Sequence, residues 1–442
     1  MAPRLPRDLP YALLCRSVVG ILLLGVTLHF SSCGGGGGAL PSQPAAAEQD
    51  PSPALKPWAL LLYDDARFNG YDPLNDFANA VGSSPNLHVV VLRGTVDGPT
   101  YAWYVDEHQA VHRLRGFDAF DTGHPHTFAM SDPDTFETFA HYVQTAFPAE
   151  RYVVAYYDHG LGWAGCCVDV TAGPTANLSM HAIRTGLAAL GHVDAVLFTA
   201  PCLMGAVESA YELRDVADVY VGSEQTSGFL YWNGAPLVWI RNALSDTPDV
   251  SAVDLAGGAV RAIEQNASSI PQYAGPLTMS AIRLAQVSGV RLAVDDLVKA
   301  LRSDAGAEND LDAVAADVQK YGDSSIVDLF DLARRLAATS SNRAVRARAA
   351  GVQAAIERTV IAETHGADCP DSHGLSILFP RAAGVAFPSA YSDPSTHLDF
   401  AANSQWDELL REYQGHGASA LRPWSASPAG NGFFPLLRGE GR

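Results

Sequence analysis

Two reactive side chains stand at the ends of two short apolar runs. His159 follows the run 153–157, and Cys202 follows shortly after the run 195–199. Continuous apolar runs of this length are typical of strands buried in a parallel sheet. Because ligands gather beyond the carboxyl ends of the strands in such sheets, two neighbouring strands would bring an imidazole and a thiol face to face. The sequence therefore predicts a cysteine–histidine dyad.

A dyad of this kind would carry out nucleophilic catalysis. Cys202 begins a predicted helix, 203–213, whose N-terminal N–H groups and dipole would lower the pKa of the thiol. His159 would act as general base and then protonate the leaving amine. The backbone N–H groups of Gly160 and Cys202 would stabilise an oxyanion, since a glycine lets the substrate approach closely.

The residues alone leave a plainer interpretation open. Cys202 could be one of the many thiols that are buried in protein cores, and His159 could be a polar residue that ends a strand. The other histidines are scattered along the chain, and no Cys/His spacing typical of zinc is present. We therefore predict no metal site.

The elements that would position these residues alternate between strand and helix from residue 58 to residue 240. This alternation predicts an α/β domain, 57–245, with a mostly parallel sheet covered by helices on both faces. Alanine-rich segments with helical spacing then predict a mainly helical C-terminal portion, 246–421, and a flexible tail, 422–442. The predicted strands are 58–63, 87–92, 101–105, 111–114, 153–157, 195–199, 219–222 and 374–379, and the predicted helices are 133–146, 180–190, 203–213, 253–264, 290–302, 326–337, 344–362 and 406–413.

The N-terminus has the features of a secretory signal. Three arginines precede an apolar stretch, 18–30, which is too short for a comfortable membrane span. The sequence Ser-Ser-Cys at 31–33, followed by five glycines, resembles a bacterial lipobox, although Phe30 stands where leucine is usual. This resemblance implies a signal peptide, 1–32, and lipidation of Cys33, which would anchor an exported protein to the cell envelope through a flexible linker, 33–56. Ordinary secretion is the alternative.

The charge of the chain excludes some partners. The formal net charge is −19 at pH 7, and removal of 1–32 with its three arginines and one aspartate makes it −21. Such acidity argues against a nucleic acid or an anionic membrane surface as the ligand. The only membrane contact that we predict is the lipid on Cys33.

Six cysteines are present, of which Cys15 would leave with the signal and Cys33 would carry lipid. An exported protein meets an oxidising compartment, so one disulfide is an option. Cys166 and Cys167 are adjacent and would bridge each other only through a strained turn. Either one of them pairs with Cys369 or all remain reduced, and Cys202 should stay out of any bridge.

Three stretches resemble the clostripain-like cysteine peptidases, which have a caspase-like sheet. They are DHGLGW (158–163), CLMGAVESAYEL (202–213) and DVYVGSEQTSGFLYW (218–232). The family shows His-Gly-x-Gly-Trp, then Asp-Ala-Cys-Leu-Met before a helix that contains Glu, then Ser-Glu-Glu running to Gly-Trp-x-Tyr. The likeness extends to 58–69, 130–133, 373–380 and 398–413, and so covers nearly the whole mature chain.

The resemblance implies that His159 is the catalytic histidine, that Cys202 is the nucleophile and that calcium is a candidate cofactor. It also implies cleavage after Arg or Lys, often with self-cleavage between the two catalytic residues. Here Ala200 replaces the aspartate that is associated with a basic substrate side chain, so we predict a preference for a neutral residue unless Glu224 points into the pocket. Between His159 and Cys202 the first basic residue is Arg184, which falls inside a predicted helix, so we expect a single chain.

The sequence thus predicts an exported cysteine endopeptidase that acts on peptide or protein substrates. Two other classes stay open. One is a catalytically inactive relative that serves as a surface binding or scaffold lipoprotein, which the replacement of the family's Asp-Ala by Ala200-Pro201 favours. The other is a polysaccharide-binding lipoprotein that uses the aromatic-rich stretch 229–239.

Overall fold

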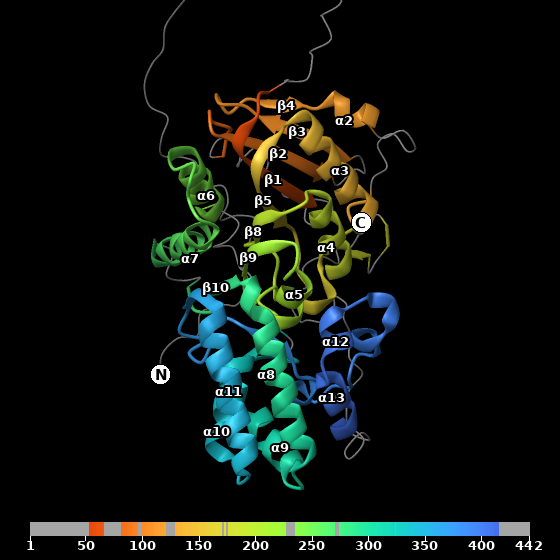
Figure 1. Cartoon of the computed structure of the whole chain (residues 1–442), viewed down its shortest axis with the longest axis vertical. Helices are drawn as coiled ribbons and strands as arrows, with labels where there is room; N and C mark the ends of the chain where they lie inside the picture. The colour runs from red at the N-terminus through yellow and green to blue at the C-terminus, as the bar shows by residue number, and fades with distance from the viewer. Residues whose placement is uncertain are drawn as a thin grey trace, which may run out of the picture. The chain divides into compact units, whose positions relative to one another are not determined.

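A mixed sheet runs through the described part of the molecule and draws its strands from both halves of the chain. The computed structural model describes residues 53–65, 81–95, 100–120, 129–169, 172–173, 176–226, 235–269, 274–322 and 324–414. Within these ranges the sheet has nine strands, in the order β13-β10-β9-β8-β5-β1-β2-β3-β4 (Figure 1). The strands from β9 to β2 are parallel to one another, and the strands at both edges are antiparallel to their neighbours.

The bounds of the elements are as follows. The strands of the large sheet are β1 (Lys56–Asp65), β2 (Leu87–Gly94), β3 (Thr100–Val105), β4 (Val111–Arg113), β5 (Ala149–Tyr157), β8 (Val193–Phe198), β9 (Ala217–Gly222), β10 (Thr278–Arg283) and β13 (Val360–His365). Two small sheets pair β6 (Cys166–Val168) with β7 (Asn177–Leu178), and β11 (Lys320–Tyr321) with β12 (Ile326–Asp328) and β14 (Ser376–Leu378). The α-helices are α2 (Arg115–Phe120), α3 (Pro133–Ala146), α4 (Met180–Ala189), α5 (Val207–Glu212), α6 (Ala235–Asp246), α7 (Ala252–Ser269), α8 (Leu284–Arg302), α9 (Ala307–Asp317), α10 (Leu329–Thr339), α11 (Arg343–Thr359), α12 (Asp399–Asn403) and α13 (Trp406–Gln414), and the 3-10 helices are η2 (Gly162–Ala164), η5 (Pro380–Ala383), η6 (Ser389–Ser392) and η7 (Pro394–Thr396).

The central strands are apolar along their whole length because both of their faces are buried. In β5, Val154 and Tyr156 belong to one hydrophobic cluster, and Val153 and Ala155 belong to another on the opposite face. Since successive side chains of a strand point to opposite faces, a strand covered on both sides must be apolar at every position. This explains the continuous apolar runs of the sequence.

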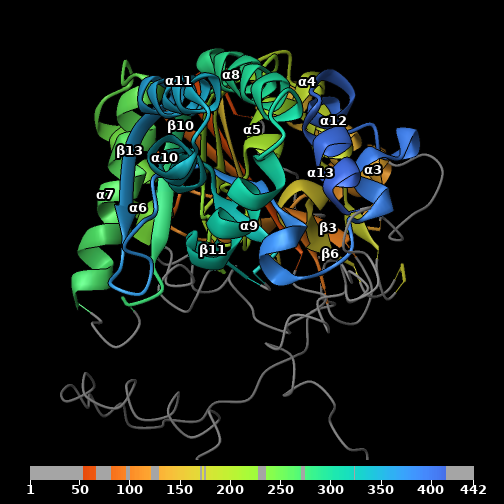
Figure 2. The same cartoon turned by 90° about the horizontal axis from the view of Figure 1, so that it is seen from below.

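Helices cover the two faces of the sheet unequally. Helices α6 and α7 pack on one face, whereas α3, α4, α5 and α8 contribute to the cluster on the other (Figures 1 and 2). The start of α3 follows the predicted capping pattern: the Asp132 side chain accepts a hydrogen bond from the Asp134 N–H, and Pro133 is the first helical residue. The α/β architecture with a mostly parallel sheet is confirmed.

The predicted boundary at 245/246 does not separate two units. Helices do dominate the C-terminal portion, but β10 pairs with β9 and β13 pairs with β10, so the large sheet continues into this portion. Residues 49–442 accordingly belong to one compact unit. The segment predicted as a helix over 326–337 begins as β12, and the one predicted over 344–362 ends in β13.

The predicted signal peptide, most of the linker and the predicted tail lie outside the described residues, as do Cys33 and its proposed lipid. Lys56, the last residue of the predicted linker, is the first residue of β1. Among the helices described, none combines the length and apolar character that crossing a membrane requires.

Candidate active site

The two predicted catalytic residues follow neighbouring parallel strands. Strand β5 pairs with β8, and Ala155 lies opposite Leu197 in the register. His159 comes two residues after the end of β5, and Cys202 comes four residues after the end of β8. Both segments therefore leave the sheet at the same edge, where an α/β sheet offers its binding sites.

Gly160 fixes how closely these two segments approach. A Cβ atom at this position would lie 2.6 Å from Cys202 N and 2.8 Å from the carbonyl carbon of Pro201, and it would overlap with Cys202 O. Only a glycine permits such an approach without displacing the backbone. The backbone after His159 thus lies directly against the backbone of Cys202, so the structure brings the two predicted segments together.

The loop that carries His159 is held by the strand β6. The Cys167 N–H donates to His159 O at 3.0 Å, and Gly160 forms an antiparallel bridge with Cys166. The bonds of this bridge are made by the residues that flank Gly160, and the Gly160 N–H donates no backbone hydrogen bond to a described residue. This N–H group therefore remains a candidate donor for an oxyanion.

Burial changes the proton affinity of the histidine. Removal of the His159 ring from water disfavours the imidazolium and lowers its pKa from 6.5 to about 4. The ring is therefore neutral near pH 7, which is the state in which it accepts a proton.

Cys202 does not stand at the start of a helix, contrary to the sequence prediction. Helix α5 begins at Val207 with Ala206 as its N-cap, and Cys202 belongs to the turn that precedes it. The Leu203 N–H donates to Gln225 O at 3.1 Å, and the Gly205 N–H donates to Ser223 O at 2.7 Å. Bonds to the segment after β9 thus take the place of the predicted first helical turn. Cys202 therefore does not stand at a helix N-terminus that would lower the pKa of its thiol.

The turn that carries Cys202 is strained. Leu203 has a φ of +62°, a left-handed conformation that costs a residue with a Cβ atom roughly 1–2 kcal/mol. Such strain persists only where the surrounding contacts hold the backbone in place. The turn that presents Cys202 is therefore determined by its neighbours rather than by local preference.

The two predicted pocket residues are both buried. Ala200 packs in the hydrophobic cluster that contains Val219 and Val221, so it offers no charge to a substrate. Glu224 is 1% exposed, and its Oε2 accepts a hydrogen bond from the Gly374 N–H at 3.0 Å. Burial first, and then the nearby Asp328, raises the pKa of Glu224 well above its usual range. Glu224 is therefore an interior residue whose carboxylate binds the Gly374 N–H.

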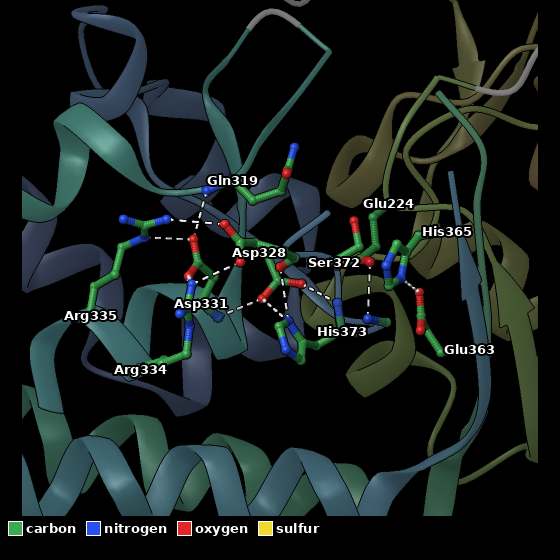
Figure 3. A network of polar contacts seen from close by, with 12 residues as sticks. Glu224, Gln319, Asp328, Asp331, Arg334, Arg335, Glu363, His365, Ser372 and His373 are labelled. Atoms are coloured by element: carbon green, nitrogen blue, oxygen red, sulfur yellow. Dashed lines mark hydrogen bonds and ion pairs between the residues drawn. The ribbon is translucent and has the colours of Figure 1, made fainter. Parts of the chain in front are cut away.

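Asp328 is a functional-site neighbour that the sequence analysis missed. It caps α10 through the Asp331 N–H at 2.6 Å, and its Oδ2 accepts from the His373 N–H at 2.7 Å. Figure 3 shows Asp328 between Asp331 on one side and His373 and Glu224 on the other. This network holds the hairpin β11–β12 and the loop before β14 beside the turn that carries Cys202. An Asp at the start of an amphipathic run was the available signal for the cap.

Asp158, the first residue of the motif DHGLGW, has a structural role that the sequence analysis did not predict. Its Oδ2 accepts from the Val168 N–H at 2.7 Å, so it anchors β6 under the loop that carries His159. Burial and the neighbouring Asp65 raise the pKa of Asp158 well above its usual range.

The disulfide between Cys369 and Cys166 or Cys167, which was one of the two predicted options, is not formed. Cys166, Cys167, Cys202 and Cys369 are all free thiols. Cys166 and Cys167 are buried in the main core with their sulfurs 3.5 Å apart. Cys369 belongs to a separate cluster, together with Leu203, against which Cys202 packs. A bridge from Cys369 to Cys166 or Cys167 is therefore not formed, because these thiols lie in different clusters.

Arg184 lies inside α4, as predicted. Its guanidinium is 3.7 Å from a carboxylate oxygen of the buried Glu212 and 3.3 Å from one of Asp399.

The described residues contain no group of three or more His, Cys, Asp or Glu side chains able to hold a metal ion.

Comparisons with known proteins agree with this architecture. The model of the clostripain family, Peptidase_C11, matches residues 65–413. A secreted C11 cysteine protease from Bacteroides thetaiotaomicron, solved with an irreversible peptide inhibitor, superposes with a TM-score of 0.58 at 16% identity, over 79% of this chain and 99% of that one. An inactive zymogen C11 protease from Parabacteroides distasonis gives 0.54 at 17% identity, over 81% and 99%.

A third structure, also of a secreted C11 cysteine protease from Bacteroides thetaiotaomicron, iotapain, gives a TM-score of 0.56 at 15% identity, over 79% of this chain and 99% of that one. No curated protein sequence matched the chain. At these identities the structural likeness shows the fold, which confirms the predicted caspase-like α/β architecture.

Proposed function

The chain belongs to the clostripain family and is therefore a cysteine peptidase, and from this membership we propose that His159 and Cys202 form its catalytic dyad. The observation that carries the proposal is the contact of the Gly160 backbone with the Cys202 backbone at the shared edge of β5 and β8. This contact leaves a thiol and a neutral imidazole on adjoining segments. A thiol next to a base is the arrangement that nucleophilic catalysis needs.

The proposed mechanism has two stages. His159 takes the proton of the Cys202 thiol as the sulfur attacks the carbonyl carbon of the scissile peptide bond, and the N–H groups of Gly160 and Cys202 stabilise the oxyanion. The proton then passes from His159 to the leaving nitrogen, the C–N bond breaks, and a thioester remains. In the second stage His159 takes a proton from water, whose oxygen attacks the thioester, and the proton returns to the sulfur as the C–S bond breaks.

We also propose that the enzyme prefers a neutral residue before the scissile bond. Ala200 stands where the family pattern has aspartate, and Glu224 is engaged with Gly374 in the interior. A basic substrate side chain would thus be buried without a charged partner, which costs roughly 3–5 kcal/mol. Strong hydrolysis of Arg or Lys fluorogenic peptides would contradict this specificity.

Export with a lipid on Cys33 completes the proposal. Two of the similar structures are described as secreted proteases, which supports export. Detection of a diacylglyceryl-modified Cys33 by mass spectrometry of the membrane fraction would support the anchor, and a free protein cleaved elsewhere would contradict it.

The decisive experiment is a peptide-library digest with the wild type, Cys202→Ala, His159→Ala and the double variant. We expect each single variant to lose turnover, and the double variant to be no worse than either single one, because residues that act as a unit give non-additive losses. Proteolysis that survives in Cys202→Ala would contradict the dyad.

A catalytically inactive relative is the second candidate, and the replacement of the family's Asp-Ala by Ala200-Pro201 is the observation that favours it. Labelling with iodoacetamide near neutral pH separates the two. In an active enzyme, iodoacetamide should alkylate Cys202 faster in the folded protein than in the denatured protein. In an inactive scaffold, the folded protein should show no such increase in rate.

A further inference from the structure

The turn that presents the nucleophile is supported by the segment 223–225, which follows β9. The Gly205 N–H donates to Ser223 O at 2.7 Å, and the Leu203 N–H donates to Gln225 O at 3.1 Å. The two bonds lie on either side of the strained part of the turn. The position of Cys202 therefore depends on how firmly this segment is held.

The backbone of the segment is fixed to β10. The Gln225 N–H donates to Thr278 Oγ1 at 2.9 Å, and the Ser223 hydroxyl lies 2.9 Å from the same oxygen. The Ser223 hydroxyl also donates to Gln225 O at 2.9 Å, so this carbonyl accepts both from the supporting segment and from the Leu203 N–H. These contacts hold the backbone of the segment 223–225 against β10.

The side chain of Gln225 joins this segment to the turn after β11. Its Oε1 accepts from the Thr226 N–H at 2.8 Å and from the Gly322 N–H at 3.0 Å. Gly322 stands at the end of β11 with a φ of +56°, and a Cβ atom there would lie 3.2 Å from Leu203 Cδ2. The hydrogen bond to the amide oxygen of Gln225 thus holds Gly322 against the Leu203 side chain. Leu203 is held by Gln225 through its backbone and by Gly322 through its side chain.

We propose that Gln225 is a positioning residue for the nucleophile: its side-chain amide holds the Gly322 turn against Leu203 and thereby fixes the strained turn that aims Cys202. The proposal rests on the proposed function of Cys202. Gln225 does not touch the reacting atoms in this role. Its amide nitrogen lies 4.0 Å from the sulfur of Cys369, which packs in the same cluster as Leu203 and against Cys202.

The choice of glutamine has an electrostatic consequence. Where the family pattern has a second glutamate, this chain has an uncharged amide of the same shape. A carboxylate could accept from the same two N–H groups, so it should hold the turn equally well. It would also bring a negative charge to the cluster that packs on Cys202, and a nearby negative charge favours the neutral thiol.

Two variants separate positioning from charge. In Gln225→Ala the acceptor is lost, and in Gln225→Glu the acceptor stays while a charge is added. The matched control is Gln353→Ala, the same change at a half-buried glutamine of α11. Each protein is measured for the melting temperature, for kcat and KM on fluorescein-labelled casein, and for the rate of alkylation of Cys202 by iodoacetamide between pH 5 and 9.

We expect Gln225→Ala to lower kcat by about 10- to 100-fold with KM little changed, because a small misplacement of a reacting group has effects of this size. Gln225→Glu should restore most of kcat at its optimum, with the midpoint of the alkylation profile moved to higher pH. Gln353→Ala should match the wild type in all three. A kcat of Gln225→Ala equal to that of the wild type, or one reduced only by the fraction of unfolded protein, would overturn the proposal.

The alkylation arm keeps the two proposals apart. If the wild type fails to cleave casein and any library peptide, the proposed function fails, but the positioning claim still predicts altered alkylation of Cys202 in both Gln225 variants. If casein is cleaved and alkylation and kcat are the same in all variants, the dyad stands and the role of Gln225 is wrong.

Discussion

At the scale of single residues, burial determines the protonation state of the proposed base. The desolvated ring of His159 has its pKa lowered to about 4, well below the ordinary value of 6.5. The imidazole of His159 therefore stays neutral, and can accept a proton, between about pH 4 and 6.5, where a solvent-exposed histidine would be charged.

This state predicts the acid limb of the activity profile. For kcat/KM, which reports groups of the free enzyme, we expect activity to fall with a midpoint near pH 4 as His159 becomes protonated. The profile should be measured from pH 3.5 to 8 on casein, with intrinsic fluorescence to show that the protein remains folded. A midpoint near 6.5 in a folded enzyme would mean that the ring of His159 is solvated in the working state.

Gly160 gives the second prediction at this scale. Gly160→Ala would push a methyl group into the backbone of Cys202, so we expect the loss of nearly all turnover and a destabilisation of about 1–3 kcal/mol. Gly289→Ala in α8 is the matched control, because a Cβ atom there meets nothing within 4 Å. Alanine in a helix interior should stabilise by about 0.5–1 kcal/mol and leave turnover unchanged. Urea denaturation and casein hydrolysis measure both effects, and a fully active Gly160→Ala would refute the close approach.

The direction of a side chain was the part of the site that the sequence could not supply. The types and spacing of His159, Gly160 and Cys202 predicted that they would meet, and their segments do. The place of Glu224 depends on the Gly374 N–H, 150 residues further along the chain. No local pattern encodes such a contact, so the inward turn of Glu224 became visible only in the structure.

At the scale of elements, local pattern was reliable where burial is regular and failed where a distant bond decides. Strands β1, β5 and β8 and helix α3 lie where the apolar pattern and the Asp132 cap predicted them. The predicted helix 203–213 starts late because Ser223 and Gln225 bind the N–H groups of the turn. Residues 360–362 fall in the predicted helix 344–362 because the residues before them have helical spacing, whereas pairing with β10 places them in the strand β13.

Helix α4 carries the prediction at this scale, which concerns self-cleavage. Arg184 is the first basic residue after His159, but it sits in the middle of α4 and its guanidinium is paired with Glu212 and Asp399. A protease needs an extended, accessible backbone, which a packed helix does not offer. We expect the active enzyme to remain a single chain between His159 and Cys202 during long incubation at 37 °C.

Denaturing electrophoresis under reducing conditions, with mass spectrometry of any fragment, tests this expectation. Arg184→Ala should give the same band pattern as the wild type. A fragment pair that joins at Arg184 and disappears in Arg184→Ala or Cys202→Ala would show that α4 unfolds to become a substrate.

At the scale of the whole molecule, the fold class followed from the alternation of strand and helix, but the extent of the sheet did not. The strands β10 and β13 lie among alanine-rich helices. Strand β10 pairs with β9 on one side and with β13 on the other, and this joins the C-terminal portion to the N-terminal half of the sheet. The hairpin β11–β12 and the loop before β14 contact the turn that carries Cys202 from this portion. The site is therefore assembled from both halves of the chain, and a variant truncated after residue 245 would lack part of the support of Cys202.

Buried acids across these halves predict how stability depends on pH. Glu208 of α5 accepts from the Leu378 N–H at 2.9 Å and from the Tyr391 hydroxyl at 3.0 Å. Burial raises the pKa of Glu208 from 4.5 to about 7. In the unfolded chain this carboxyl ionises above about pH 4.5, whereas in the folded protein it keeps its proton up to about pH 7. Its contribution to the free energy of unfolding therefore falls as the pH rises from about 4.5 to 7 and is constant above.

Buried histidines act in the opposite direction and would mask this trend in the wild type alone. Burial lowers the pKa of His88, as of His159, to about 4, so acidification below pH 6.5 favours the unfolded chain, in which both rings become charged. These contributions cancel in the difference between the wild type and Glu208→Gln, because both proteins contain the same histidines. Glutamine keeps the oxygen that accepts from Leu378 and Tyr391 and cannot ionise.

We therefore expect the unfolding free energy of Glu208→Gln, relative to the wild type, to rise between about pH 5 and 7 by roughly 1–3 kcal/mol and then to level off, since one pH unit is worth at most about 1.4 kcal/mol for one group. Urea denaturation at half-unit steps from pH 5 to 8.5 measures this difference. Glu264→Gln, the same change at an exposed position of α7, is the matched control and is measured over the same pH range. A difference for Glu208→Gln that does not change with pH would mean that this carboxyl is ionised in the folded protein, and that the contact between α5 and the C-terminal portion is a charged one.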